Sequence, residues 1–226
     1  MKNLVILTGA GISAESGIMT FRDMGGMWEQ YDIMEVASPE GWEKDKQLVL
    51  NFYNERRKQL KEVKPNYGHI GLIELEEEYN VQIITQNVDD LHERAGSKNI
   101  LHLHGELTKV RSTVDSALIH TLDGWELKLG DKCAKGSQLR PHIVWFGEAV
   151  PAIEEAVEIT SKADIFVVIG TSLAVYPAAS LINYTPENCQ KYLIDPNEVG
   201  VDSDVKVIKE KASKGVKILL SKLLKS

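Results

Sequence analysis

The sequence predicts an α/β fold with a mainly parallel β-sheet and helices on both of its faces. Four short runs carry this prediction: NLVILT, VQIIT, DIFVVIG and KYLID. Each run is continuously apolar and rich in Val, Ile or Leu, which is typical of parallel strands covered on both sides. Helical patterns lie between and after the runs, and such an alternation of strands and helices favours this fold class.

In chain order, we expect strands at 3–8, 81–85, 164–170 and 191–195. Ile153, Ala156 and Val157 recur at helical spacing and form one apolar stripe of a predicted helix. A second helical stripe near the carboxyl terminus consists of Val216, Leu219, Leu220 and Leu223. Both helices are expected to pack on the sheet.

Two long segments predict a small lobe beside the sheet. The segment between the first two strands is longer than a crossover helix needs. A second irregular stretch follows at about 109–139, with a turn signal at Asp123-Gly124 between SALIHTL and WELKL. A chain of 226 residues is long enough for one main domain with such a satellite.

Composition and charge exclude several function classes. A net charge of -7 and an apolar fraction of 43% argue against binding to nucleic acid. Cys133 and Cys189 are too few for a disulfide scaffold. The amino-terminal apolar run is too short for a signal peptide, and no stretch reaches the length of a membrane-spanning helix. We therefore expect a cytoplasmic protein with no membrane partner. It begins at a strand and ends on a helix, so no terminal tail is expected to recruit partners.

Polar clusters follow all four predicted strands. They are GAGISAESG, QNVDD, TS and PNE. Ligands of open parallel sheets bind beyond the carboxyl ends of the strands, so the clusters should share one crevice. GAGISA also fits G-x-G-x-x-A, in which glycines let backbone N–H groups approach a pyrophosphate. The acidic residue that dehydrogenases place about twenty residues further on lacks its strand context here, which argues against an oxidoreductase.

Taken in order, GAGISAESGI, TQNVDDLHERAG, HLHGEL, RPHIVWFGE and GTSLAVYPAA resemble the sirtuin family of NAD-dependent protein lysine deacylases. The resemblance covers nearly the whole chain. It implies a Rossmann-like parallel sheet with helices on both faces, in one catalytic domain over 1–226, with a small lobe from insertions at about 23–65 and 109–139. It also implies NAD as the cofactor and acyl-lysine proteins as substrates; the oligomeric state is left open.

The resemblance implies roles for matching residues. The cofactor-binding loop comprises Gly9, Ala10, Gly11, Ser13, Ala14, Glu15, Thr20, Phe21 and Arg22. The nicotinamide and ribose pocket comprises Gln86, Asn87 and Asp89, and the adenosine side comprises Gly170, Thr171, Ser172, Asp195 and Pro196. The segment that pairs with the substrate peptide as an added strand comprises Val144, Trp145, Phe146, Gly147 and Glu148.

Two histidines in HLHGEL pose a choice of catalytic residue. If this run is an alternating strand, His102 and His104 point to the same face. In the family's pattern the histidine directly before the glycine is catalytic, which selects His104. An imidazole titrates near ~6.5 and accepts a proton near neutral pH. Family chemistry implies attack of the acyl oxygen on C1′ of the nicotinamide ribose, with His104 as the base on a ribose hydroxyl, giving nicotinamide, free lysine and O-acyl-ADP-ribose. We interpret His102 as a packing or hydrogen-bonding neighbour and His92 as structural.

A helical run predicts a site for acidic acyl groups. Leu48, Phe52, Arg56 and Leu60 recur at four-residue intervals, so Arg56 interrupts an apolar stripe, where it either snorkels or reads a carboxylate. Sirtuins that remove acidic acyl groups carry Tyr-x-x-Arg here, and YNER supplies Tyr53 with Arg56. Arginine matches a carboxylate through two charge-assisted hydrogen bonds. Succinyl and malonyl groups are therefore expected substrates beside acetyl.

The usual zinc site of the family is missing. Most sirtuins hold a structural zinc with two Cys-x-x-Cys pairs. Here KVRSTVDSA has no cysteine, and DKCAKGSQLRP has Cys133 with Gly136 in the partner's place. We therefore predict no bound metal and a lobe held by packing. Its expected core residues are Leu118, Ile119, Leu122, Trp125, Leu127 and Leu129.

Two other functions remain open at this point. One keeps NAD cleavage but changes the acceptor, giving a mono-ADP-ribosyltransferase or NAD hydrolase. The other is a non-catalytic NAD-sensing module, against which the presence of His104, Asn87 and Asp89 argues.

Overall fold

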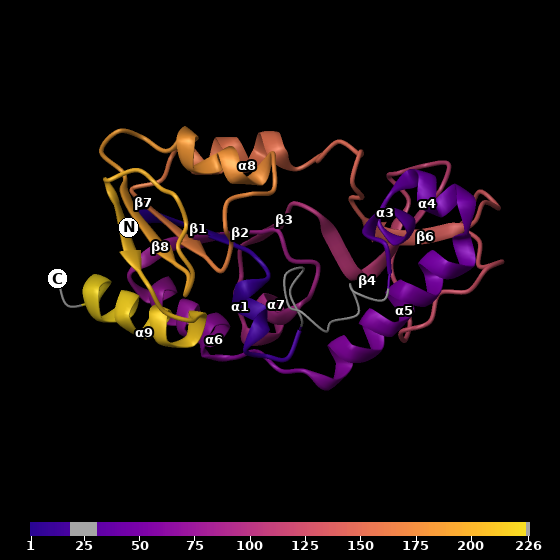
Figure 1. The fold of residues 1–226 in the computed structure, drawn as a ribbon, viewed down its shortest axis with the longest axis horizontal. Helices are drawn as coiled ribbons and strands as arrows, with labels where there is room; N and C mark the ends of the chain where they lie inside the picture. Colours follow the sequence, from indigo (N-terminus) through magenta and orange to yellow (C-terminus); the bar gives the residue numbers. More distant parts are fainter. Residues whose placement is uncertain (19–30, 225–226) are drawn as a thin grey trace.

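The structure is a computed structural model that describes residues 1–18 and 31–224. Its main layer is a six-stranded parallel sheet in the order β3-β2-β1-β7-β8-β9 (Figure 1). The strands are β1 (Lys2–Thr8), β2 (Tyr79–Thr85), β3 (Ile100–His102), β7 (Ile165–Ile169), β8 (Gln190–Ile194) and β9 (Val205–Ile208). All four predicted strands are confirmed, and β3 and β9 are additional.

The direction of the chain across the sheet reverses at β1. From β1 the chain adds β2 and β3 on one side, and later it adds β7, β8 and β9 on the other. β1 therefore pairs in parallel with both β2 and β7. In open α/β sheets such a reversal leaves a crevice at the carboxyl ends of the strands, where ligands bind. The Rossmann-like prediction is confirmed by this order.

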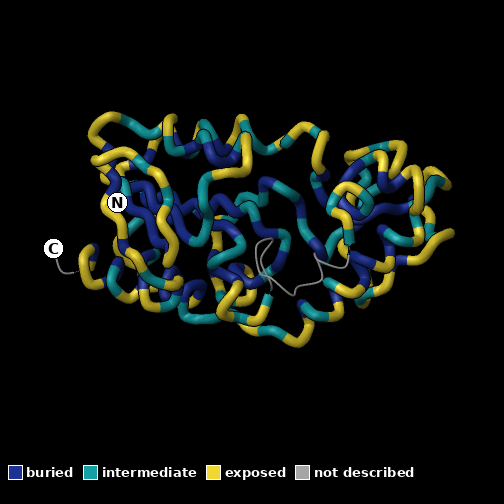
Figure 2. The backbone as a smooth tube through the Cα atoms, in the orientation of Figure 1, coloured by how far each residue is buried: buried dark blue, intermediate teal, exposed yellow. Residues whose placement is uncertain are grey.

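Helices cover both faces of the sheet. Helices α6 (Tyr67–Ile73) and α9 (Ala212–Leu223) lie on one face with the 3-10 helix η1 (Glu74–Glu77), and α8 (Ile153–Thr160) and η2 (Ala178–Tyr184) lie on the other (Figure 1). Leu4 and Ile6 belong to the first core, whereas Val5 and Leu7 belong to the second. β7 is buried along its whole length, and β1, β2 and β8 are buried toward their carboxyl ends (Figure 2). Burial on both sides explains why their sequences are continuously apolar.

A smaller unit lies beside the sheet, with its own core. Its antiparallel strands are β4 (Gly105–Ser112), β5 (Ile119–Thr121) and β6 (Leu139–Ile143), in the order β5-β4-β6. Its helices are α3 (Ile33–Val36), α4 (Pro39–Lys44) and α5 (Lys46–Glu62). Asp45 caps α5 by accepting a hydrogen bond from the amide of Leu48. The core joins residues of α5 to residues of β4 and β6.

Part of the expected packing in this unit is wrong. Leu127 is buried, and Leu118 and Leu122 pack against the core, but the side chains of Ile119 and Leu129 are 42% and 56% exposed. Ile119 lies on β5, which is short and pairs with β4 alone. A short edge strand leaves one side to solvent. Trp125 is half-buried beneath the ammonium group of Lys58, 3.8 Å from its ring centroid.

The run HLHGEL is not one alternating strand. β3 ends at His102 and β4 begins at Gly105, with a bend between them. Gly105 has φ +81, and a Cβ there would lie 2.0 Å from the carbonyl oxygen of His142. Only glycine fits this close approach, which occurs at the first residue of β4.

No described helix has the length and apolar character that a membrane crossing requires.

Candidate active site

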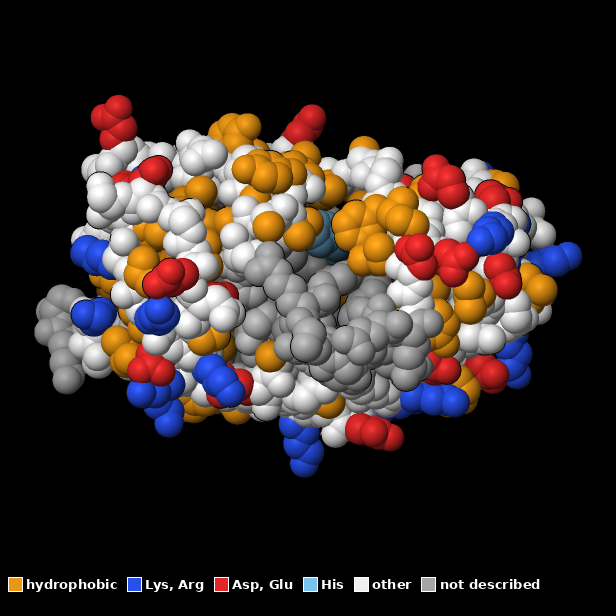
Figure 3. Space-filling view, in the orientation of Figure 1, with side chains coloured by type: hydrophobic (Ala, Val, Ile, Leu, Met, Phe, Trp, Pro, Cys, Tyr) orange, Lys and Arg blue, Asp and Glu red, His pale blue; other side chains and the backbone are white. Residues whose placement is uncertain are grey.

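A cavity of about 1070 Å³ opens at the carboxyl ends of β1, β2, β7 and β8. Each predicted strand-end cluster contributes to its wall, for example through Gly9, Gln86, Thr171 and Asn197, and Asp195 directly after β8 lines it as well. The expectation of one shared crevice is therefore confirmed. In Figure 3 the molecule is hollowed between its two parts, and hydrophobic side chains surround a histidine at this place.

The glycine loop fits tightly against the end of β7. Gly9 N donates to Ile169 O and Gly11 N donates to Gly170 O. A Cβ on Gly11 would lie 2.7 Å from Gly170 Cα, so Gly11 and Gly170 can approach this closely only because both are glycine. Short helix α1 (Gly11–Ala14) follows, and its amides donate within the loop. Within the described residues the N–H of Ala10 has no acceptor, so it is the loop amide available to a ligand.

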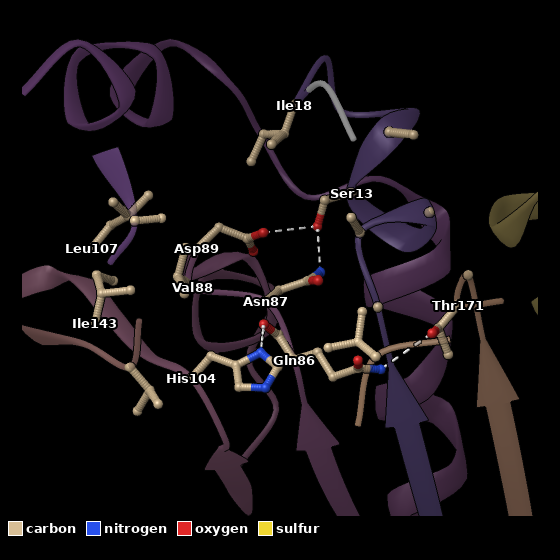
Figure 4. Close-up of a pocket in the computed structure, with 18 of the residues that line it drawn as sticks. Ser13, Ile18, Gln86, Asn87, Val88, Asp89, His104, Leu107, Ile143 and Thr171 are labelled. Atoms are coloured by element: carbon tan, nitrogen blue, oxygen red, sulfur yellow. Dashed lines mark hydrogen bonds between the residues drawn. The ribbon is translucent and has the colours of Figure 1, made fainter. Parts of the chain in front are cut away.

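Polar side chains from the next loop line the cavity beside this glycine loop. Asn87 Nδ2 donates to Ser13 Oγ over 3.1 Å, and Ser13 Oγ donates to Asp89 Oδ2 over 3.0 Å (Figure 4). Burial raises the pKa of Asp89, against the opposing hydrogen bonds from Leu91 N and Ser13. Gln86 Nε2 reaches Thr171 Oγ1 over 3.3 Å and connects this loop to the end of β7. Three strand ends are thus linked around one opening.

His104 stands at the centre of the cavity wall. Its Nδ1 lies 3.0 Å from Gln86 O, and because a carbonyl only accepts, Nδ1 carries the proton (Figure 4). Nε2 therefore keeps its lone pair. Burial lowers the pKa of the ring below its usual 6.5, partly offset by the bond to Gln86. His104 is thus a neutral base at neutral pH.

His102 has a different environment. Its Nδ1 lies 3.2 Å from Asn87 O and its Nε2 lies 2.7 Å from Glu93 Oε1, on α7 (Leu91–Ala95). Both partners accept, so both nitrogens carry protons. Burial alone lowers the pKa of His102, but the hydrogen bond and charge of Glu93 outweigh it and the pKa is raised. His102 is held as a cation away from the cavity lining.

Two further histidines lie beneath the loops. His92 Nε2 is 3.0 Å from Thr8 Oγ1, His69 Nε2 is 3.4 Å from Ser13 Oγ, and their rings pack with centroids 5.0 Å apart. Burial lowers the pKa of both, that of His69 to about 4. They are neutral members of the buried polar layer under the cavity.

The far end of the cavity is formed by α5 and the segment after β6. Tyr53 and Arg56 lie one turn apart on α5, and both line the cavity. Burial lowers the pKa of Arg56, against the opposing effects of Tyr53 and Asp89. Leu107 and Ile143 supply an apolar wall on the side of His104 opposite Thr171 (Figure 4). Both wall residues lie within motifs of the sequence, HLHGEL and RPHIVWFGE, but sequence reasoning alone assigned neither of them a role.

The segment Val144 to Glu148 is largely engaged within the protein. Val144 N donates to His104 O and Phe146 N donates to Ala37 O, each over 2.9 Å. Trp145 N donates to Glu148 Oε2 over 2.8 Å. Of the segment's amides, that of Gly147 has no acceptor within the described residues. Gly147 N–H is thus the donor that remains for an added peptide strand.

The other predicted site residues are also placed, with one exception. Ala14, Glu15, Ser172 and Pro196 line the cavity with those described above. Thr20, Phe21 and Arg22 lie outside the described residues.

The surroundings of Cys133 do not fit a thiolate zinc site. Its Sγ lies 3.2 Å from Ser112 Oγ and 3.1 Å from Ser137 Oγ. These bonds, that of Ser112 first, lower the pKa of the thiol to about 7. Serine hydroxyls are not ligands of structural zinc. Gly136, in the partner's place, has no side chain to bind a metal. That the lobe holds no zinc stays a prediction.

Comparison with known proteins agrees with this geometry. The sequence model of the Sir2 family matches residues 9–177. A protein of Bacteroides thetaiotaomicron named NAD-dependent protein deacylase is 58% identical over 231 residues, 99% of each chain. One of Helicobacter pylori with the same name is 57% identical over 228 residues, covering 99% of this chain and 98% of the other.

Solved structures give the same result. A Sir2 homologue in complex with NAD superposes with a TM-score of 0.90 at 39% identity, covering 99% of this chain and 90% of that one. A mutant Sir2 homologue in complex with ADP-ribose has the same TM-score and identity and covers 99% and 92%. The resemblance noted from the motifs is confirmed: the chain belongs to the Sir2 family.

Proposed function

We propose that the protein is an NAD-dependent protein deacylase that removes acyl groups from lysine side chains. The observation that carries the proposal is the state of His104, a neutral ring with its Nε2 lone pair unprotonated, in the crevice where the four strand ends meet. Relatives named NAD-dependent protein deacylase at 57–58% identity over the full chain support it.

The residues of the crevice fit NAD. Gly9, Gly11 and Gly170 line the cavity and pack closely around one another, and Ala10 offers an amide for a phosphate oxygen. Thr171, Ser172 and Asp195 line the adenosine end, and Gln86, Asn87 and Asp89 line the nicotinamide end. When bound, NAD would supply the ribose, with nicotinamide as the leaving group at C1′ and a hydroxyl that accepts the acyl group.

The protein's side chains would accept the proton of a ribose hydroxyl and orient the groups that take part. Gln86 O fixes the ring of His104, so that Nε2 takes a proton from a ribose hydroxyl as the general base. Ser13 and Asn87 hold Asp89 within the same network. Leu107 and Ile143 would offer an apolar wall to the acyl chain.

The acyl pocket is proposed to accept succinyl and malonyl groups as well as acetyl. Arg56 and Tyr53, one turn apart on α5, both line the cavity, and a guanidinium with a phenol hydroxyl matches a terminal carboxylate. Arg56→Met keeps the length and apolar stem while removing the charge. We expect kcat/KM for a succinyl-lysine peptide to fall about 10- to 100-fold, as for a lost charge-assisted bond, with a smaller fall for the acetyl peptide. Equal losses on both would refute the acidic preference.

The activity itself is tested by mass spectrometry of NAD incubated with acetyl- and succinyl-lysine peptides. Deacylation gives nicotinamide, free lysine and O-acyl-ADP-ribose in equal amounts. Nicotinamide released at the same rate without peptide would indicate an NAD hydrolase, and ADP-ribose attached to protein would indicate a transferase. Binding of NAD without any product would indicate a sensing module.

The substrates are proposed to be acyl-lysine proteins of the cytoplasm. Two cysteines that are free rather than paired are compatible with a reducing compartment. The division into one domain with a lobe from about 23–65 and 109–139 is likewise proposed.

A further inference from the structure

The hydroxyl of Tyr53 is held by a buried indole. Trp145 Nε1 donates a hydrogen bond to Tyr53 Oη over 3.0 Å, and the two residues are 2% and 3% exposed. An indole N–H only donates, so the hydroxyl is the acceptor in this bond. Among the described residues, Trp145 is the hydrogen-bond partner of this hydroxyl, and no acceptor for its own proton is present.

The indole is itself held by two neighbouring side chains. The guanidinium of Arg140 lies 3.3 Å from the ring centroid of Trp145, and the ring of Trp42 lies 5.7 Å away on a tilted plane. Glu148 binds Arg140 through two bonds of 2.7 and 3.0 Å and also accepts from Arg111. A cation over the ring face attracts electron density from it and strengthens the N–H as a donor. Trp145 therefore presents its N–H to Tyr53 at a set position.

The bond from Trp145 decides where the phenol proton points. Burial raises the pKa of Tyr53 to about 12, so the hydroxyl is protonated at neutral pH. A hydroxyl has one proton to donate and lone pairs that accept, and the indole takes one of the accepting positions. The proton must then point away from the indole. Because Tyr53 lines the cavity beside Arg56, the free direction serves a ligand that accepts hydrogen bonds.

We propose that Trp145 is a positioning residue for acyl-chain selectivity. By occupying an acceptor position of Tyr53, its indole N–H directs the phenol O–H toward the carboxylate of an acidic acyl chain. A neutral acyl group such as acetyl has no terminal acceptor at that end of the cavity and gains nothing from this direction. The inference rests on the proposed deacylase function and assigns to the Trp145 side chain a task distinct from peptide pairing by the backbone.

The test is a double-mutant cycle on selectivity. The quantity is kcat/KM for a succinyl-lysine peptide divided by that for the acetyl-lysine peptide of the same sequence. Trp145→Phe keeps the aromatic ring and removes the N–H, and we expect the ratio to fall about tenfold, the effect of one lost hydrogen bond of about 1.4 kcal/mol. In the Tyr53→Phe background, Trp145→Phe should not lower the ratio further. Trp125→Phe, which changes a tryptophan of the same unit that packs under Lys58, is the matched control and should keep the wild-type ratio.

A second readout does not depend on turnover. The dissociation constants of the two peptides are measured by calorimetry on His104→Asn protein with and without Trp145→Phe, after circular dichroism has shown equal folding. The proposal is supported if Trp145→Phe lowers the succinyl-to-acetyl ratio of kcat/KM and raises the succinyl-to-acetyl ratio of dissociation constants. A ratio unchanged by Trp145→Phe, or lowered equally when Tyr53 is absent, overturns it. Absence of deacylation in the wild type counts against the proposed function alone, since the binding ratio still decides the role of Trp145.

Discussion

His102 and His104 make the same kind of hydrogen bond through Nδ1 but differ in what surrounds Nε2. Their Nδ1 atoms donate to the consecutive carbonyls of Asn87 and Gln86, at 3.2 and 3.0 Å. The Nε2 of His102 then meets Glu93 at 2.7 Å, whereas the His104 ring lines the cavity. One ring is therefore a fixed cation and the other a neutral base. The comparison teaches that the group opposite the second nitrogen, rather than the motif spacing, assigns each task.

Replacing each ring in turn with asparagine is the most direct test of the different roles of His102 and His104. His104→Asn keeps a donor for Gln86 O but removes the basic nitrogen, so kcat/KM for an acyl peptide should fall about 100- to 10,000-fold. His102→Asn should lower it far less, because that ring takes no proton from the substrate complex. Production of O-acyl-ADP-ribose is the measurement. Equal losses in two well-folded variants would show that both rings take part in proton transfer.

The buried rings of His69 and His92 should make the folded protein less stable in acid. Burial lowers both pKa values, that of His69 to about 4, so below the ordinary value of 6.5 the folded state binds fewer protons than the unfolded state. Keeping these two rings neutral therefore costs no stability above pH 6.5, and the free energy of unfolding decreases as the pH falls below it. His69 alone should cost about 2 kcal/mol between pH 7 and pH 5.

Urea unfolding at a series of pH values measures this acid effect. His69→Asn should reduce the slope with pH, and His120→Asn, at an exposed residue, should preserve it. A slope unaffected by His69→Asn would show that this ring is not a buried neutral base. The contribution of His102 to the free energy of unfolding depends on pH in the opposite direction, because its pKa is raised in the folded protein. This contribution is fully present below pH 6.5 and is lost as the pH rises through the folded pKa.

The smallest effect is expected from Glu93→Gln. Removing the carboxylate leaves burial as the main influence on His102, so its pKa should fall, while that of His104 should stay where it is. The side chain of Glu93 is partly exposed, and the loss of stability at pH 6 should be about 0.2–1 kcal/mol. NMR titration of the two rings provides the measurement, with Glu106→Gln as a weaker charge control. Equal shifts in both rings would mean that they are coupled.

Much of the architecture could be predicted because it depends on local patterns. Continuous apolar runs identify the four central strands, and the polar residues that follow them must meet at one edge of a parallel sheet. The need for glycine at position 105 could not be predicted, since it depends on the His142 carbonyl, which arrives from β6. Exposure of Ile119 likewise depends on β5 being an edge strand, a property of the assembled sheet.

For the site, too, the sequence indicates which residues take part but not which contacts they make. Motifs name the residues around the crevice, but they do not show that Gly9 and Gly11 use their amides on β7 and the residue after it, leaving that of Ala10. Nor does sequence separation suggest that Trp145 and Tyr53 touch, 92 positions apart. Contacts of this kind depend on the tertiary fold, for which one sequence carries no local signal.

The place of β1 between β2 and β7 has a consequence for how the molecule is made. β1 leaves the ribosome early, yet its second neighbour begins at Ile165. Until that part is synthesised, one edge of β1 has no partner. Pairing over so long a stretch of chain slows folding and leaves an unsatisfied edge exposed to aggregation. We therefore expect nascent chains that stop before β7 to need protection by chaperones.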